Sequence, residues 1–275
     1  MSERRESGLD LDALLVVAER AARAGGDIVR AHFGLLREVR EKAPGDYVSE
    51  ADLASEATVR DVLVRETGLP VYGEEAGGEE VETGWLVDPL DGTANFVHGF
   101  DAVGVSVGLI VDGVPAVGVV DAPLLGRTFT AVQGRGACRD GQPISVADRA
   151  PEQAIVATGF PFRRKDLLPR YRPAFDAAFQ RFEDLRRVGA ASLDLCWTAE
   201  GVFDGFFELH LGPWDVCAGA LIVREAGGVV TDWDADDDAW LRSGNILAGP
   251  PGVHTALLEI VTEGTDKSFD GPSGP

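Results

Sequence analysis

Apolar residues recur at helical spacing near the start of the chain. Between residues 10 and 33 they fall about every three or four positions, for example at Leu11, Leu14 and Ala18. This period predicts one long amphipathic helix. After the turn-like sequence KAPGD, residues 52–66 again place apolar side chains among charged ones, which predicts a second helix.

Short apolar runs then replace the helical period. They cover residues 69–72, 85–88, 102–111, 114–120 and 128–132. Runs of this length, in which small and branched residues alternate, are typical of strands. The sequence VDGV between the third and fourth runs predicts a tight hairpin turn, so we expect these strands to belong to one sheet.

Strands and helices alternate in the second half of the chain. The expected strands are 154–159, 202–209, 229–233 and 245–248, and the expected helices are 170–182, 190–200 and 215–226. This alternation predicts an α/β arrangement. We place a boundary near 145–153 and expect an N-terminal α+β part (1–148) and a C-terminal α/β part (149–262) that share a continuous interface, because no long linker separates them. Residues 263–275 lack an apolar period and are expected to form a flexible tail.

The chain is strongly acidic. Its 275 residues include 46 Asp and Glu against 25 Lys and Arg, which gives a formal net charge of −21. Such a surface repels phosphate backbones, so nucleic acid is not an expected partner. Only three of the basic residues are lysines. Acidity with scarce lysine is typical of a halophilic protein, because concentrated salt screens the self-repulsion.

Targeting and cysteine patterns exclude several further classes of protein. The chain has no run of about 18 apolar residues, and its N-terminus MSERRESGLDLD is polar where a signal peptide needs an apolar stretch. We therefore expect a cytoplasmic protein with no membrane partner. Cys138, Cys196 and Cys217 show neither CxxC spacing nor paired histidines, which argues against disulfide and zinc frameworks.

Four carboxylates stand at the ends of predicted strands or helices. They are Glu74 in a GEE turn, Asp88 and Asp91 in WLVDPLDGTANF, and Asp215 in PWD. Carboxylates that meet in one pocket repel each other and lose solvation, so they persist together around bound cations. The pattern indicates a hard-metal site with oxygen ligands. Two simpler interpretations stay open, namely a capped turn at DPLDGT and, for Asp215, an acid that matches the helix dipole.

The segment 85–96 combines this pair of acids with an expected anion site. The apolar residues WLV are expected to form the end of a strand, which places Asp88 at the edge of the sheet. Pro89 is expected to end the hydrogen bonding between strands, because it cannot donate a backbone hydrogen bond. Gly92 allows a ligand to approach the backbone closely, and Thr93 opens a short helix whose first N–H groups can bind a phosphate. The sequence therefore predicts a phosphate site bridged by metals.

The order and approximate spacing of five motifs resemble those of the inositol monophosphatase family. The motifs are GEE, WLVDPLDGTANFVHGF, RVGAASLDLC, GPWDVCAGALIVREAGG and SGNILAG, and the resemblance runs from about residue 10 to 262. It implies a magnesium-dependent, lithium-sensitive sugar-phosphate phosphatase with a layered αβαβα sandwich, usually a homodimer. Archaeal members of this kind often resemble both inositol-1-monophosphatases and fructose-1,6-bisphosphatases.

The resemblance also implies which groups hold the metals and the water. The metal ligands would be Glu74, Asp88, Asp91, Asp215 and the carbonyl of Leu90, around about two or three Mg²⁺ ions. The segment KAPGDYVSEAD is similar to the family's catalytic loop. It puts the water-activating acid at Asp52 and a mobile-loop lysine at Lys42, with Thr93 and Glu74 as the partners that orient the attacking water.

Substrate contacts are implied at Asp91, Gly92, Thr93, Ala191, Glu208 and Asp215. Three positions depart from the family's pattern. His210 stands where a glycine is common, and we expect it to narrow the substrate pocket. Ser49 replaces a common threonine, and Ala51 replaces a residue that is often threonine just before the water-activating acid.

Two charged clusters lie outside these motifs. Arg163, Arg164 and Lys165 form a rare basic cluster, which fits a surface ion-pair site or, as the resemblance implies, a contact with a second substrate phosphate or with a dimer partner. The acidic run 232–238 is similar to a calcium loop, but Asp237 stands where such a loop needs glycine. We therefore expect a solvated loop.

Three functions compete for this sequence. The first is Mg²⁺-dependent hydrolysis of inositol 1-phosphate and related sugar phosphates. The second is hydrolysis of fructose 1,6-bisphosphate or, less favoured, of a nucleoside bisphosphate. The third is a non-enzymatic, metal-stabilised interaction protein, which the full set of expected ligands disfavours. The absence of GxxxxGK[ST], a complete GxGxxG and HExxH argues against nucleotide-driven transfer and zinc hydrolysis.

Overall fold

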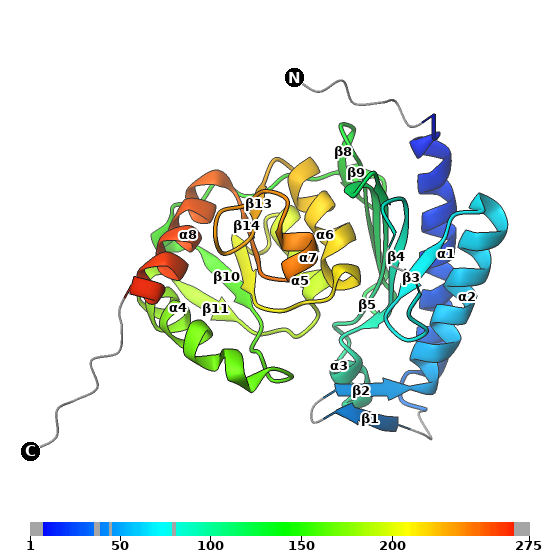
Figure 1. The fold of residues 1–275 in the computed structure, drawn as a ribbon, viewed down its shortest axis with the longest axis horizontal. Coiled ribbons are helices and arrows are strands. Elements are labelled where there is room, and N and C mark those ends of the chain that lie inside the picture. Colours follow the sequence, from blue (N-terminus) through cyan, green and yellow to red (C-terminus); the bar gives the residue numbers. More distant parts are fainter. Residues whose placement is uncertain (1–7, 36–38, 44–45, 79–80, 267–275) are drawn as a thin grey trace, which may run out of the picture.

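A seven-stranded sheet forms the centre of the N-terminal half in the computed structural model, which describes residues 8–35, 39–43, 46–78 and 81–266 (Figure 1). Its strands, in spatial order, are β3 (Val71–Gly73), β4 (Gly84–Asp91), β5 (Gly104–Val111), β6 (Val114–Ala122), β7 (Arg127–Val132), β8 (Gly136–Arg139) and β9 (Gln142–Pro143). β3 runs parallel to β4, and the other neighbouring pairs are antiparallel. The strand-rich sheet expected from the apolar runs is therefore present.

The turn between β5 and β6 has the geometry that VDGV predicts. Asp112 and Gly113 have φ values of 51° and 76°. Both central residues of a type I′ turn need such positive values, because this turn matches the right-handed twist of the flanking strands. The predicted hairpin is confirmed.

Two long helices cover one face of this sheet, as Figure 1 shows. They are α1 (Leu11–His32) and α2 (Glu50–Thr67), which pack against each other, and α1 also packs on β5 and β6. Asp10 caps α1 by accepting the amide of Ala13 at 3.1 Å, and Ser49 caps α2. The helical period therefore predicted both helices to within a few residues.

A two-stranded hairpin precedes α2 and was not predicted. Its strands are β1 (Val39–Ala43) and β2 (Asp46–Ser49), and β2 lies beside the short helix α3 (Thr93–Val97) (Figure 1). Charged residues interrupt this segment, so it shows neither a helical nor an alternating apolar period. The segment KAPGDYVSEAD therefore crosses a hairpin and enters a helix.

The second half contains a five-stranded sheet of order β11-β10-β12-β14-β13. Its strands are β10 (Ile155–Thr158), β11 (Asp184–Arg186), β12 (Gly205–Glu208), β13 (Val229–Thr231) and β14 (Ile246–Gly249). Its helices are α4 (Leu168–Arg181), α5 (Ala191–Ala199), α6 (Pro213–Glu225), α7 (Trp240–Ser243) and α8 (Pro251–Asp266), with short 3₁₀ turns at Pro151–Gln153 and Lys165–Leu167. Because β10 is parallel to its two neighbours and β14 antiparallel to both of its own, the sheet is mixed.

The two sheets sandwich a layer made of α5 and α6, while α4 and α8 cover the outer face of the smaller sheet (Figure 1). α6 packs directly on β4 to β7. Glycines permit this close approach: a Cβ on Gly108 would lie 2.6 Å from Sγ of Cys217, and one on Gly118 would lie 2.8 Å from the carbonyl oxygen of Ala218. The order of layers is the αβαβα sandwich that the resemblance implied.

The structure also differs from the expected elements at two boundaries, and it contains several elements that were not predicted, namely β8, β9, β11, α7 and α8. β4 continues through Pro89 to Asp91, with an irregular register between Asp88 and Asp91 where Pro89 had been expected to end the ladder. α8 was not predicted, and it extends to Asp266, past the expected start of the tail; 267–275 lie outside the described residues. Among the helices that the structure describes, none is long and apolar enough to cross a membrane.

Candidate active site

A cavity of about 530 Å³ opens where several chain segments meet between the two sheets. Its wall comes from the turn after β3, the end of β4, the starts of α3, α5 and α6, and the loops after β10, β11 and β12. The sequence-predicted residues on this wall are Glu74, Asp88, Leu90, Asp91, Gly92, Thr93, Ala191, Glu208 and Asp215. The fold thus brings together side chains that lie far apart in the sequence, such as Glu74 and Asp215, which are 141 positions apart.

Three carboxylates form the acidic end of the cavity. Glu74, Asp88 and Asp215 each offer one oxygen, and these oxygens lie within 4.8 Å of one another. Burial and the neighbouring charges of Glu74, Asp91 and Asp215 raise the pKa of Asp88 well above its usual value. Burial and the charge of Asp91 raise the pKa of Asp215 to about 7. The cluster is therefore costly to ionise without a cation.

Asp91 belongs to the same wall but is held separately. Its Oδ2 accepts the amide of Ser192 at 2.7 Å and the hydroxyl of Ser192 at 2.5 Å. Burial raises the pKa of Asp91, and these hydrogen bonds act in the opposite direction. With Oδ2 held by Ser192 at the start of α5, the carboxylate of Asp91 is fixed in orientation.

Asp52 lies behind the cavity wall and is completely buried. It occupies the first turn of α2, where its Oδ2 accepts the amide and hydroxyl of Ser49 at 2.8 and 2.6 Å. Its Oδ1 accepts the hydroxyl of Thr93 at 3.0 Å. Burial raises the pKa of Asp52, against the hydrogen bonds from Ser49 and Thr93. The serine that replaces the common threonine thus keeps the hydroxyl that this acid uses.

The main-chain turn that carries Glu74 is held by a residue that we did not predict. Glu56 on α2 is 2% exposed, and its carboxylate accepts the amides of Glu75 at 2.8 Å and Ala76 at 3.1 Å. Arg60, one helical turn later, pairs with the same carboxylate at 2.9 Å. Glu56 lies four residues after Asp52 on the same helix face, and that spacing is the only sequence signal that could have singled it out.

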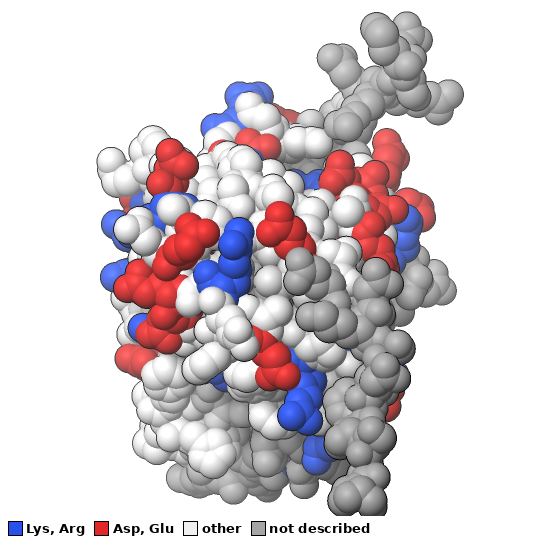
Figure 2. Space-filling model, turned by 90° about the vertical axis from the view of Figure 1, so that its left-hand side faces the viewer, with Lys and Arg blue, Asp and Glu red and all other residues white. Residues whose placement is uncertain are grey.

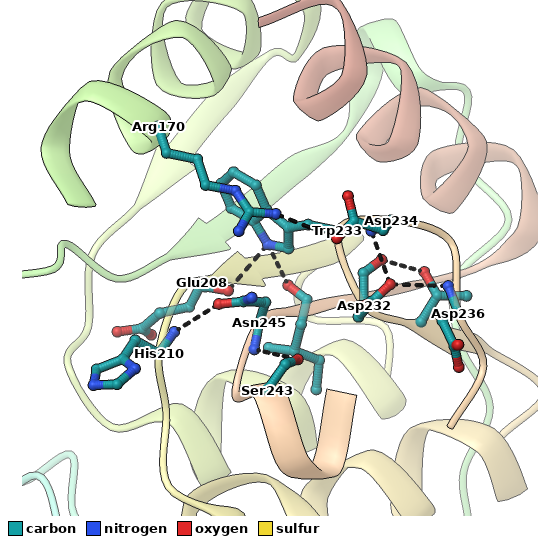
Figure 3. Close-up of polar contacts among 11 residues, drawn as sticks. Arg170, Glu208, His210, Asp232, Trp233, Asp234, Asp236, Ser243 and Asn245 are labelled. Carbon is teal, nitrogen blue, oxygen red and sulfur yellow. Dashed lines mark hydrogen bonds and ion pairs between the residues drawn. The ribbon is translucent and has the colours of Figure 1, made fainter. Parts of the chain in front are cut away.

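Glu208 lines the same cavity as the other positions at which the resemblance implies substrate contacts. Burial raises its pKa to about 7, opposed by the charge of Arg187. The backbone of Glu208 is held by Trp233, whose Nε1 donates to the carbonyl oxygen of Glu208 at 3.1 Å (Figure 3). Ala191 begins α5 on the same wall. Lys42 lies on β1, and its side chain is outside the described part of the chain.

The acidic run 232–238 lies away from this cavity and forms a turn of its own. Oδ1 of Asp232 accepts the amides of Asp234 and Asp236, both at 2.8 Å (Figure 3). Asp236 in turn accepts the amides of Asp238 and Ala239, both at 2.9 Å. These carboxylates are satisfied by local backbone groups, and positions 234–238 are exposed, as expected for a solvated loop.

The acidic end of the cavity fits a divalent metal. Its donors are all oxygens, burial and the neighbouring acids raise the pKa of Asp88 and of Asp215, and Leu90 lies on the same wall. Oxygen-only donor sets select hard cations such as Mg²⁺. The carbonyl oxygen of Leu90 lies 3.1 Å from Oγ1 of Thr93, so this hydroxyl shares its one proton between Leu90 and Asp52. This contact ties the Asp52–Thr93 pair to the acidic wall of the cavity.

Comparisons with known proteins agree with this geometry. The family model described as "Inositol monophosphatase family" matches residues 10–265. "Nus factor SuhB" of Haemophilus influenzae is 39% identical over 258 residues, which cover 91% of this chain and 96% of that protein. "Fructose-1,6-bisphosphatase/inositol-1-monophosphatase" of Aquifex aeolicus is 37% identical over 257 residues, covering 91% and 96%.

Solved structures show the same fold. The "extragenic suppressor protein suhB" of Bartonella henselae has a TM-score of 0.86 and 35% identity, and the match covers 92% of this chain and 99% of that chain. The inositol monophosphatase of Anabaena (Nostoc) sp. has a TM-score of 0.82 and 34% identity, covering 93% and 97%. These likenesses confirm the layered sandwich.

Proposed function

Because the chain belongs to the inositol monophosphatase family, we propose that it is a metal-dependent phosphatase acting on monoesters of inositol and related sugars. One observation carries this proposal: Glu74, Asp88 and Asp215 meet at a cavity that also contains the Thr93 hydroxyl, which is hydrogen bonded to Asp52. Grouped acids beside a held hydroxyl are the parts that metal-assisted hydrolysis requires.

Mg²⁺ is the proposed cofactor. Glu74, Asp88, Asp91 and Asp215 would hold it together with the Leu90 carbonyl, as the oxygen-only donor set favours. When bound, the ions would neutralise charge on the phosphate and make water more acidic. The same binding would offset the burial and the mutual repulsion that raise the pKa of Asp88 and of Asp215.

Asp52 and Thr93 are proposed to orient the attacking water. Thr93 donates its proton to Asp52, so the lone pairs of its oxygen remain to accept a hydrogen bond from water in the cavity. Burial raises the pKa of Asp52, which suits it to take up a proton that is passed on through Thr93. Glu74, at the acidic end of the same cavity, would be a further partner of this water.

The phosphate is proposed to bind at the start of α3. Gly92 precedes this helix with a φ of 86°, and a Cβ there would lie 3.0 Å from the carbonyl oxygen of Ala102. Any larger residue would crowd the turn, whereas glycine leaves the first amides of the helix open to an anion. Ala191 and Glu208 would then contact the sugar.

Inositol 1-phosphate is the preferred substrate of this proposal, and fructose 1,6-bisphosphate is the alternative. The name of the Aquifex aeolicus relative gives both activities, which supports retaining both substrates as candidates. A nucleoside bisphosphate is the third candidate. A comparison of kcat/KM on the three substrates ranks them directly.

A phosphate-release assay, run in parallel with Mg²⁺ and with EDTA, tests whether the protein is a metal-dependent phosphatase. Phosphate release from inositol 1-phosphate should require Mg²⁺ and stop in EDTA. Asp88→Asn should lose at least about a hundredfold in kcat/KM while staying folded, because removing one carboxylate weakens metal binding. Equal, near-zero release with Mg²⁺ and with EDTA would contradict the proposal. Activity retained by Asp88→Asn would show that the metal assignment is wrong.

Several curated relatives are named Nus factor SuhB, so a non-enzymatic role is the competing proposal. That name also weighs against excluding nucleic acid, an exclusion that rests on the net charge of −21 alone. Cytoplasmic location, halophily, lithium sensitivity, a homodimer and the division at residue 148 likewise stay predictions. The Mg²⁺ and EDTA assay separates the enzyme from a protein that only binds partners.

A further inference from the structure

One part of the cavity wall is aromatic, in contrast to the acidic end. Phe160, Phe162 and Trp214 line the same cavity as the carboxylates. Phe162 is 57% exposed, and among the large apolar side chains that are exposed in the described part of the chain, it is the one that lines this cavity. A single exposed apolar residue is ordinary on a protein surface, but one at a ligand cavity can be covered by the ligand.

The ring of Phe162 is supported by a packed aromatic cluster. Its centroid lies 5.7 Å from that of Phe160, with the two ring planes at 69°. Phe160 packs in turn against Tyr171 and Phe175 on α4, at centroid distances of 5.6 and 5.8 Å. The amide of Phe162 also donates to the carbonyl oxygen of Phe160 at 2.7 Å. An aromatic side chain that is already held in this way loses little conformational freedom when a ligand packs on it.

The segment that carries Phe162 runs from the implied sugar contact to the candidate metal ligands. Gly159, directly after β10, lies against Glu208, because a Cβ there would collide with the carboxylate of Glu208. Four residues later, Nη1 of Arg163 lies 3.9 Å from Oε1 of Glu74. Phe162 therefore belongs to the part of the wall that connects these two ends. A monoester whose phosphate lies at the acidic end would place its alcohol along this part.

We propose that Phe162 is a specificity-determining residue, on whose exposed ring the apolar face of the substrate's ring packs. The hydroxyls of inositol lie mostly around the edge of its ring, so C–H groups form the two faces. Burying such a face against a phenyl ring removes apolar surface from water on both sides. The preferred substrates would therefore be monoesters of cyclic alcohols. This inference rests on the proposed function, since it takes the phosphate to bind beside Thr93.

Two substrates that differ in the ring isolate this contact. Inositol 1-phosphate and glycerol 2-phosphate are both phosphate monoesters of secondary alcohols, and the second has no ring. The measured quantity is the ratio of their kcat/KM values. Phe162→Ala should lower this ratio about fivefold to tenfold, the loss expected when roughly 50 Å² of apolar contact is removed. Phe162→Tyr keeps the aromatic ring and should stay within about twofold of the wild type.

The control is Phe179→Ala on α4, a phenylalanine that is 73% exposed and does not line the cavity. It removes the same ring from the surface and should leave the ratio unchanged. Circular dichroism checks that each variant is folded. A Phe162→Ala ratio equal to that of the wild type would overturn the inference, as would an equal drop in Phe179→Ala.

A second explanation for an exposed ring is contact with another copy of this chain. Size-exclusion chromatography tests it on the same variants. A smaller species in Phe162→Ala, together with equal losses on both substrates, would assign the ring to an interface and overturn the inference. An unchanged elution volume with a lowered ratio would support the substrate contact.

Calorimetric binding of the two esters separates this inference from the proposed activity. If the wild type hydrolyses neither ester, the proposed function fails, and the ratio of the two dissociation constants decides the inference. Tighter binding of inositol 1-phosphate that weakens in Phe162→Ala but not in Phe179→Ala would support it. The same affinity ratio in the wild type and in Phe162→Ala would reject it.

Discussion

Asp215 shows how one side chain can satisfy two interpretations of its sequence position. The simpler interpretation expected an acid at the start of this helix, and Asp215 does lie in the first turn of α6, where its Oδ2 accepts the amide of Gly212 at 2.7 Å. The same carboxylate lies with Glu74 and Asp88 at the acidic end of the cavity. A helix-capping acid and a candidate metal ligand are therefore not alternatives here.

The pKa of Asp215 gives a test in metal-free protein. Burial and the charge of Asp91 raise this pKa to about 7, whereas the unfolded chain keeps the usual value. Below the unfolded value both states are protonated and there is no penalty. As pH rises, the unfolded state releases its proton first, so the folded state loses stability until about pH 7. Asp215→Asn should therefore become more stable than wild type as pH rises from about 4 to 7, by on the order of 2–4 kcal/mol.

Urea unfolding in EDTA at several pH values measures this difference, and asparagine can still accept the Gly212 amide. Added Mg²⁺ should reverse the order, because a ligand that binds only the folded state stabilises it, and the wild type binds more tightly. A stability difference that does not change with pH would show that the carboxylate is not costly to ionise.

At the scale of elements, the sequence predicts helices and turns that have a local pattern. It does not predict contacts between residues that lie far apart in the chain. The period of α1 and the VDGV turn each determine their structure from a few neighbouring residues. α8 was missed because its apolar residues follow the helix-breaking sequence GPPG. Glu56 was not predicted, because its partners, the amides of Glu75 and Ala76, lie about twenty residues away in the sequence. The four acids were found because their motifs are local.

Glu56 gives the prediction at this scale. Glu56→Gln keeps the shape of the side chain but removes the charge that the two turn amides and Arg60 share. The variant should lose about 1–3 kcal/mol of unfolding free energy and bind Mg²⁺ more weakly, because the turn that presents Glu74 loosens. Denaturant unfolding and metal titration measure the two effects.

Glu66→Gln is the matched control, since Glu66 lies on the same helix and pairs with the exposed Arg20 at 2.9 Å. An exposed pair contributes at most about 1 kcal/mol, so this variant should stay near wild type. If Glu56→Gln behaved like the control in both measurements, the anchoring role of Glu56 would be wrong.

The whole molecule carries its excess negative charge on the surface. On the face drawn in Figure 2, acidic side chains gather in groups with fewer basic ones between them. Many of the ion pairs in the described chain are themselves exposed, such as Arg65 with Asp61, whose side chains are 63% and 65% accessible. Pairs of this kind contribute little, so they do not offset the self-repulsion of a chain with net charge −21.

Salt should therefore stabilise this protein. Raising KCl from about 0.1 M to about 1 M shortens the Debye length from about 10 to about 3 Å, which screens repulsion between surface carboxylates more than it weakens buried contacts. We expect Tm to rise across this range in metal-free protein. A neutral osmolyte at the same osmolality separates screening from general exclusion effects, and it should give a smaller rise.

Asp237→Asn with Asp238→Asn provides the charge control within the chain, because both side chains are exposed in the loop after β13. The double variant changes the net charge from −21 to −21 + 2 = −19. With less repulsion to screen, its Tm should start higher at low salt and rise less in KCl. A Tm that falls with KCl, or rises equally in the neutral osmolyte, would mean that surface repulsion does not limit stability. The acidic composition would then need a cause other than adaptation to salt.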